Sequence, residues 1–117
     1  MFLTLNHQKR DVYQSSKTFV LECYKFSKLL PADEKFGMIS QIRRAALSVH
    51  LNVAEGCSRK SLNERKRFYE IARGSLIEVD TALDIAIDLE YTSKEKSETL
   101  GKLIVRAFQL ISKMITP

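Results

Sequence analysis

The sequence predicts an all-α protein, an up-down-up-down antiparallel four-helix bundle. Apolar residues recur at three- and four-residue spacings in four segments, which is the pattern of amphipathic helices. The 117 residues include only two prolines and four glycines, so long helices are allowed and a turn-rich β fold is disfavoured. Short connections between the segments place consecutive helices antiparallel. We expect one domain over residues 1–117, with a short extension over residues 1–9.

The first helix is expected over about Lys9–Leu30. Pro31 ends it, because proline cannot continue a helix and restricts the residue before it. Cys23 lies on its apolar stripe and is interpreted as a core residue rather than a nucleophile. With Cys57 it fits neither a disulfide framework nor a metal set, which indicates a reduced cytosolic setting. The expected core positions are Val12, Phe19, Cys23, Phe26 and Leu30, with Val20 and Leu29 beside them.

The second helix is expected over about Phe36–Gly56, with Gly56 as its C-terminal cap. Its main apolar stripe is Met38, Ile42, Ala45, Ala46, Val49 and Val53. A narrow polar stripe runs beside it and comprises Gln41, Arg44, Ser48, Asn52, Glu55 and Arg59. A smaller apolar strip, Leu47, Leu51 and Ala54, lies beyond the polar one. Polar groups between two apolar strips indicate an interface, either between helices or between subunits.

The third helix is expected from near Ser61, where Ser61 and Glu64 match a capping box, to about Glu90. Gly74 marks a thin spot where another backbone approaches closely, or else a tolerated glycine on an exposed face. The expected outer acidic ridge is Asp80, Asp84 and Asp88, solvated rather than functional. The expected inner face is Phe68, Ala72, Ser75, Val79, Ala82, Leu83 and Ala86.

The fourth helix is expected to begin near Thr92 or Ser93, because Thr92 and Glu95 match a second capping box. It continues to the end of the chain. Its near-heptad apolar stripe is Leu100, Leu103, Ile104, Ala107, Leu110, Ile111 and Met114.

Positive charge is concentrated in one region. The formal net charge is +5, and the eight basic and three acidic residues of segment 40–73 account for all of it. Such a basic surface favours polyanions, nucleic acid first; the alternative is a solvated helix face on an ordinary basic protein. Phe68 is expected in the core and only Tyr69 is available to stack on bases, which favours phosphate contact over base readout. The candidate nucleic-acid-binding residues are Arg43, Arg59, Lys60, Arg65, Lys66, Arg67 and Arg73.

No motif for catalysis, a cofactor or a metal is found. The two histidines, His7 and His50, lack the Glu-x-x-His spacing of di-metal bundles, and His50 is interpreted as a residue of the bundle surface. Glu55 is the only plausible buried carboxylate, with Arg44 and Arg59 as partners and Asn52 as a bridge. A structural network is favoured over catalysis by Glu55. Without a signal peptide or an apolar run of about 20 residues, we expect a cytoplasmic protein without a membrane segment.

One long motif resembles the four-helix-bundle family of 23S rRNA intervening-sequence proteins, also called S23-type proteins. It reads Arg43-Arg44-Ala45-Ala46-x-Ser48-Val49-x-x-Asn52-Val53-Ala54-Glu55-Gly56, then Arg59, then Ala72-Arg73-Gly74-Ser75-Leu76-x-Glu78. The valines at 49 and 53 stand where isoleucine is commoner in the family. Carried onto this chain, the family's motif residues are Gln41, Arg44, Ser48, Asn52, Glu55, Gly56, Arg59, Gly74, Ser75 and Glu78.

The resemblance implies a bacterial cytosolic protein that forms a homopentamer and has no established enzymatic activity. The family is similar in fold to the accessory protein of diversity-generating retroelements, a basic pentamer that binds nucleic acid and a reverse transcriptase. We therefore expect a non-enzymatic homo-oligomer that binds RNA or DNA. The alternative is a protein-interaction scaffold without nucleic-acid binding. Enzymatic activity is the least favoured hypothesis.

Overall fold

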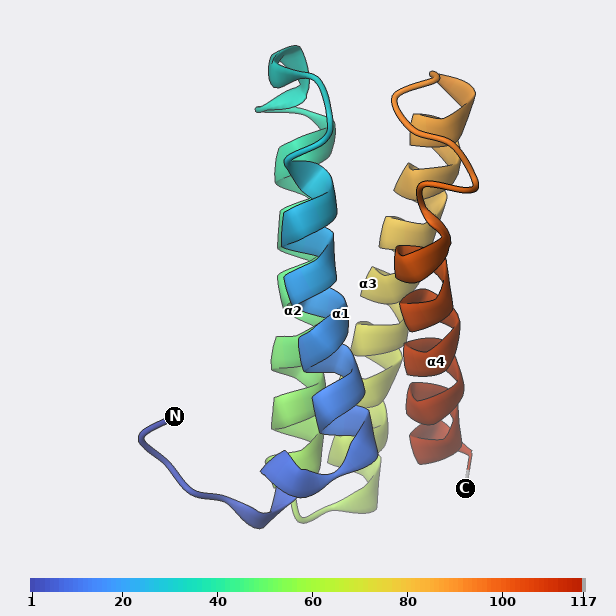
Figure 1. Ribbon diagram of the computed structural model, residues 1–117. Coiled ribbons are helices and arrows are strands. Elements are labelled where there is room, and N and C mark those ends of the chain that lie inside the picture. Colours follow the sequence, from blue (N-terminus) through green and yellow to red (C-terminus); the bar gives the residue numbers. More distant parts are fainter. Residues whose placement is uncertain (117) are drawn as a thin grey trace.

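The computed structural model describes residues 1–116 and confirms the four-helix bundle (Figure 1). Consecutive helices run in opposite directions, and α4 returns to pack on α1 as well as α3, which closes the bundle. The chain contributes helices α1 (Asp11–Ser27), α2 (Met38–Ser58), α3 (Leu62–Asp88) and α4 (Glu98–Ile115), with short 3-10 turns η1 (Asn6–Lys9) and η2 (Ala32–Glu34). Between residues 1 and 116 no helix is long and apolar enough to cross a membrane.

The core predicted for the first helix is confirmed, apart from its end. All five expected core positions and Val20 are buried. Leu29 was expected beside them but is 70% exposed. The helix ends at Ser27, and Leu29 lies in a tight turn where its backbone N–H bonds to the carbonyl of Phe26 at 2.9 Å. Pro31 therefore follows this turn rather than the helix itself.

Gly56 is not a helix cap, which corrects the prediction. The helix α2 continues to Ser58, and Gly56 is buried against the ring of Tyr69 on α3. A Cβ atom at residue 56 would lie 2.8 Å from Cε1 of Tyr69, closer than carbon atoms pack. Glycine is therefore required here because α2 and α3 approach closely, and not because the chain must turn.

The helix α3 begins at the predicted cap but presents a rotated face. The backbone N–H of Glu64 donates to Oγ of Ser61 at 3.4 Å, as expected for the cap. Tyr69 is 1% exposed and Phe68 is half-buried, the reverse of the prediction. The ring of Tyr69 occupies the space left by Gly56, which turns that side of α3 inward. The buried residues of α3 are Tyr69, Ala72, Leu76, Val79, Leu83 and Ala86, while Ser75 and Ala82 are half-buried.

The connection between α3 and α4 is longer than predicted. The helix α3 ends at Asp88, and Glu90 adopts a left-handed conformation with φ of 63°. The N–H of Tyr91 then bonds back to the carbonyl of Ala86 at 2.9 Å, which is the closure of a Schellman motif. The helix α4 begins at Glu98 rather than near Thr92. No capping box forms at Thr92; instead Oγ of Ser93 accepts the N–H of Lys96 at 3.1 Å within a separate turn.

Candidate functional site

Polar side chains of the family-like motif meet between α2 and α3. Nε2 of Gln41 donates to Oε2 of Glu78 at 3.2 Å, and the hydroxyls of Ser48 and Ser75 lie 2.9 Å apart. Asn52 donates Nδ2 to the carbonyl of Ser48 at 2.8 Å and to its hydroxyl at 3.1 Å. We call Gln41, Arg44, Ser48, Asn52, Ser75 and Glu78 the polar seam.

The polar seam borders a shallow hollow of about 220 Å³ on the surface of the bundle. Arg44 and Glu78 lie at its exposed side, and Ser48 and Ser75 are half-buried. Because the small hydroxyls bond directly to each other, they let the two helices approach while satisfying both polar groups. The seam therefore joins helices within one chain, and its outer side remains open.

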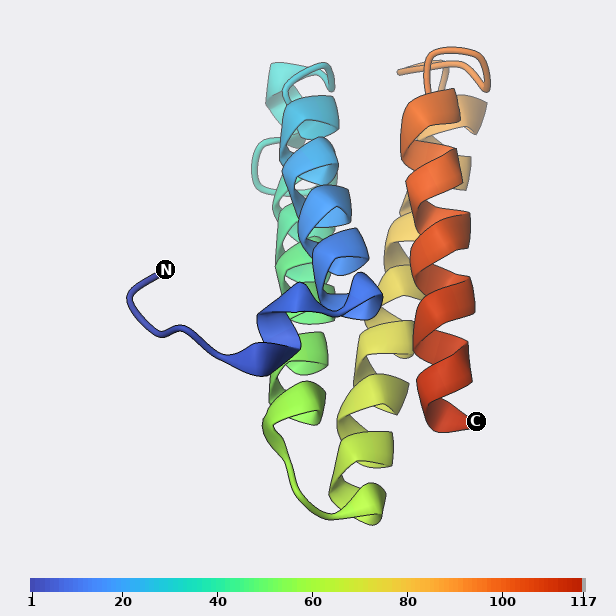
Figure 2. The same ribbon diagram turned by 60° about the horizontal axis from the view of Figure 1, so that its bottom comes forward.

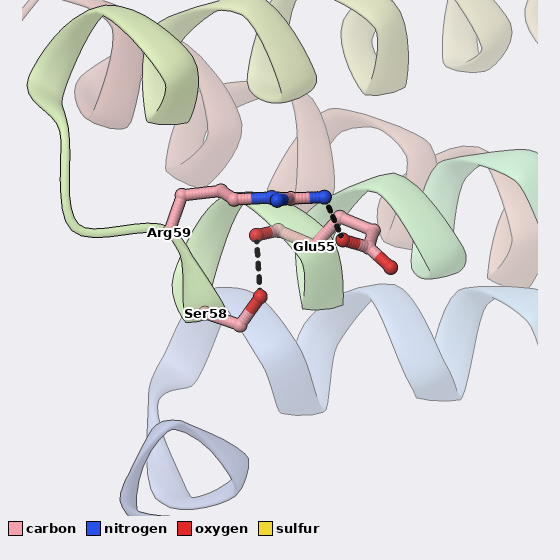
Figure 3. A network of polar contacts seen from close by, with 3 residues as sticks. All are labelled: Glu55, Ser58 and Arg59. Atoms are coloured by element: carbon pink, nitrogen blue, oxygen red, sulfur yellow. Dashed lines mark hydrogen bonds and ion pairs between the residues drawn. The ribbon is translucent and has the colours of Figure 1, made fainter.

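Glu55 is exposed, which corrects the prediction of a buried carboxylate. Its Oε2 accepts a hydrogen bond from Nη2 of Arg59 at 2.9 Å, the predicted partner four residues later (Figure 3). Ser58 donates its hydroxyl to the backbone carbonyl of Glu55 at 2.8 Å. Arg44 lies three helical turns away, about 16 Å along α2, and is not a partner. Asn52 bonds to Ser48 instead of bridging to Glu55.

Apolar side chains remain uncovered on both sides of the polar seam. On α2, Leu47 and Leu51 are 41% and 54% exposed, in line with a second apolar strip. On α3, Ile71 and Ile85 are exposed, and a Cβ atom at Gly74 would meet nothing within 4 Å. Gly74 therefore makes no close packing within the chain. We call Leu47, Leu51, Ile71, Gly74 and Ile85 the outer α2–α3 face.

The exposed isoleucines of α3, Ile71 and Ile85, were not predicted from the sequence. Ile71, Glu78 and Ile85 are spaced by seven residues, which places them on one side of a helix. This repeat places Ile71 and Ile85 on the same side of α3 as the charged Glu78, and it is the signal for an exposed side that carries apolar residues. It is easily masked by the stronger stripe that forms the core.

Five of the seven candidate basic residues gather at the connection between α2 and α3. We call Arg59, Lys60, Arg65, Lys66 and Arg67 the turn cluster. Two of them are engaged: the guanidinium of Arg59 also lies 4.9 Å from the ring centre of Phe68, and Nε of Arg65 donates to the carbonyl of Arg59. Over residues 1–116, no ion pair involves Lys60, Lys66 or Arg67. These three side chains are exposed to solvent, where a ligand can reach them.

Arg43 and Arg73 belong to other surfaces. Arg43 lies about 24 Å from Arg59 along α2, and its Nε donates to Oγ of Ser27 on α1 at 2.8 Å. Arg73 points to α4, where Nη1 donates to Oγ of Ser112 at 3.4 Å. Arg43 is therefore separated from the turn cluster, whereas Arg73 lies two turns of α3 beyond Lys66 with its guanidinium bonded to α4.

A second polar contact between helices was not predicted. Nδ1 of His50 on α2 lies 2.7 Å from Oγ of Ser16 on α1, and the His50 ring packs edge-on against Tyr13. Burial lowers the pKa of His50 below its usual value, and the charge of Lys17 acts in the same direction. Among residues 1–116, no group of three or more His, Cys, Asp or Glu side chains is arranged to hold a metal ion.

Comparison with known proteins gives one family and a similar fold. A family model described as 23S rRNA-intervening sequence protein matches residues 8–115. A crystal structure of a protein of unknown function from the S23 ribosomal protein family of Bacteroides thetaiotaomicron is 24% identical in sequence. It superimposes with a TM-score of 0.83 over 91% of this chain and 99% of that chain, which shows a shared fold. No curated protein matches the sequence.

Proposed function

Since this chain belongs to the 23S rRNA-intervening sequence protein family, we propose that it is a non-enzymatic, self-associating bundle that binds RNA or DNA through phosphate contacts. The proposal places it in the bacterial cytoplasm, with itself as one partner and a nucleic acid as the other. The expected assembly is a homopentamer, as the resemblance implies.

The observation that supports nucleic-acid binding is the turn cluster. Segment 59–67 has five basic residues and one acidic residue, at one end of the bundle. Long, flexible cations without ion-pair partners suit phosphate oxygens, which accept charge-assisted hydrogen bonds from any direction. Arg59 stacks on Phe68 and pairs with Glu55, so its guanidinium is less available to a phosphate than the cations without such contacts. Affinity is therefore assigned chiefly to Lys60, Lys66 and Arg67.

The observation that supports self-association is the outer α2–α3 face. Exposed leucines and isoleucines beside a glycine form a patch to which a second copy can pack closely. The polar seam at its centre supplies groups, Arg44 and Glu78 among them, that fix the register of such a contact. Repeating the chain around a closed assembly also repeats the turn cluster, which multiplies the positive charge that one nucleic acid meets.

The test is binding of labelled RNA and DNA across a salt series, with the mass of the protein measured in the same buffers. We expect affinity to fall steeply with salt, with a slope of roughly −0.7 to −0.9 per phosphate neutralised. Replacing Lys60, Lys66 and Arg67 with Gln should lower the magnitude of that slope by about 2 to 3 and leave the assembly intact. The matched control replaces Lys28, Lys35 and Lys96, which are exposed at the opposite end of the bundle.

Each outcome assigns a role. Equal losses in the two triple variants would mean that only net charge matters, and the turn cluster would not be the site. An assembled protein that binds no nucleic acid at low salt would favour the alternative, a scaffold for another protein. A pull-down whose partners survive nuclease treatment would support that alternative directly.

A further inference from the structure

An apolar groove between α3 and α4 is open to solvent. It consists of two adjoining hollows of about 530 and 360 Å³, which share Asp80, Val105 and Gln109. Leu83 and Ile87 line the first hollow, and Ile77 and Phe108 line the second. Val105 between them is 56% exposed. A groove of this size and composition is suited to apolar side chains of an extended segment.

The N-terminal arm, residues 1–5, is the most exposed apolar segment of the chain. Phe2 is fully exposed and Leu3 is 64% exposed. Nε2 of Gln8 donates to the carbonyl of Leu3 at 3.2 Å, and Oε1 of Gln8 accepts the N–H of Leu5 at 3.2 Å. The hydroxyl of Tyr13 also lies 3.1 Å from Sδ of Met1. These contacts leave the apolar side chains of Phe2 and Leu3 exposed and able to meet another surface.

The arm does not reach the groove of its own chain. The turn η1 that carries it packs on α1 and α2, and the arm projects from that side of the bundle, away from α3 and α4 (Figures 1 and 2). The groove lies on the opposite pair of helices. An arm that fills such a groove must therefore come from another molecule.

Residues 1–5 are long enough to cover most of the groove. The lining of the groove extends along α4 from Ser97 to Gln109, which is about 18 Å of helix. Five extended residues span about 16 Å. The groove also offers polar groups at its rim, among them Asp80, Arg106 and Gln109, to backbone groups of the arm that Gln8 leaves free.

We propose that the N-terminal arm of one copy docks in the α3–α4 groove of a neighbouring copy, with Phe2 and Leu3 as its anchors. The proposal rests on the self-association proposed above and is independent of nucleic-acid binding. Because the arm and the groove are different surfaces, the contact is head-to-tail, which closes into a ring or continues as a filament. The arm would then add to contacts of the outer α2–α3 face.

Disulfide trapping between two single variants tests the contact. Phe2→Cys protein is mixed with Val105→Cys protein, oxidised mildly and separated without reductant; the natural Cys23 and Cys57 are buried and compete little. The control mixture replaces Val105→Cys with Leu62→Cys, at an exposed apolar position outside the groove. We expect several-fold more cross-linked dimer in the Val105 mixture. Equal yields in the two mixtures would overturn the docking.

Mass measurements separate this failure from failure of the proposed function. An assembly without the Phe2–Val105 cross-link overturns the arm contact alone, whereas a protein that stays monomeric at high concentration overturns both proposals. A cross-link of Leu51→Cys with Val105→Cys, in place of the arm pair, would show that α2 of the neighbour fills the groove.

Serine substitution of the anchors gives a second measurement. Replacing Phe2 and Leu3 with Ser should weaken self-association at least about tenfold, because each anchor loses a buried apolar surface. Phe36→Ser, at another exposed phenylalanine that does not line the groove, is the matched control and should leave the dissociation constant unchanged. Unchanged association of the arm variant would contradict the proposal.

Discussion

Replacing Gly56 with Ala tests whether the close approach of α2 and α3 is required. A Cβ atom there would lie 2.8 Å from Cε1 of Tyr69 and 3.0 Å from Cδ1 and Cζ of the same ring. Tyr69 is 1% exposed, so the ring has no open space to move into. The helices must separate, or the ring must leave its preferred position. Overpacking of this kind costs about 1 to 3 kcal/mol.

A matched substitution isolates that cost from helix propensity. Alanine in a helix interior is favoured over glycine by about 1 kcal/mol, and this gain applies to Gly74→Ala as well. At Gly74 the added methyl group meets nothing within the chain. We therefore expect Gly74→Ala to stabilise the folded chain and Gly56→Ala to be less stable than Gly74→Ala by about 1 to 3 kcal/mol.

Urea unfolding followed by helical circular dichroism measures this difference. With a slope of about 1 to 2 kcal/mol per molar urea, the two midpoints should differ by roughly 1 M. The series is repeated at several protein concentrations, because a change in self-association alters the concentration dependence. Equal midpoints for Gly56→Ala and Gly74→Ala would refute the packing argument. In a double-mutant cycle, Tyr69→Leu should relieve most of the Gly56→Ala penalty.

Three further predictions follow from local features. Glu90→Gly should raise the free energy of unfolding by up to about 1 kcal/mol, because the residue adopts a left-handed conformation that glycine tolerates; urea midpoints check this. Burial lowers the pKa of His50 in the folded state, so the unfolded chain binds more protons at this residue. The stability that neutral His50 contributes is present above its unfolded-state pKa and is lost as pH falls through its folded-state pKa. His50→Gln should reduce this pH dependence of the free energy of unfolding, measured from pH 7.5 to 5. Burial, reinforced by the charge of Glu22, raises the pKa of Cys23 to about 12, so the native protein at pH 8 should leave this thiol unlabelled by a maleimide until urea unfolds it, and peptide mapping shows which cysteine reacts.

Periodicity was sufficient to predict the four helices and most of the core. Those positions depend on spacing along one helix, which a single sequence displays directly. Helix ends depend more on the neighbouring element: the start of α3 after Ser61 was predicted, whereas the ends of α1 and α2 and the start of α4 were not. Gly56 resembles a cap because glycine often ends a helix, yet its role depends on Tyr69, thirteen residues later on another helix. Glu90 ends α3 without any glycine, and no local rule predicts a glutamate at that position.

Among the candidate residues, contacts within one helix were predicted better than contacts between helices. The ion pair of Glu55 and Arg59 was correct because both residues lie one turn apart on the same helix. The predicted burial of Glu55 was wrong, since burial depends on what packs against α2. Arg43 and Arg73 were grouped with the turn cluster by charge alone, although each points to a different neighbouring helix. Contacts between helices, such as Ser48 with Ser75, require the relative rotation of the helices.

The polar seam and the turn cluster occupy different parts of the molecule, so the residues that hold the fold together are not those proposed to bind nucleic acid. The motif residues Gln41, Ser48 and Ser75 bond within the chain and set the distance between α2 and α3. These contacts do not involve the turn cluster. Membership of the family therefore accounts for the bundle, whereas the proposed nucleic-acid binding is assigned to Lys60, Lys66 and Arg67 and does not follow from the family alone. We expect Asn52→Ala to weaken the fold or assembly more than nucleic-acid binding, because its amide donates to the Ser48 hydroxyl that contacts Ser75 on α3, and we expect the turn-cluster variants to do the reverse.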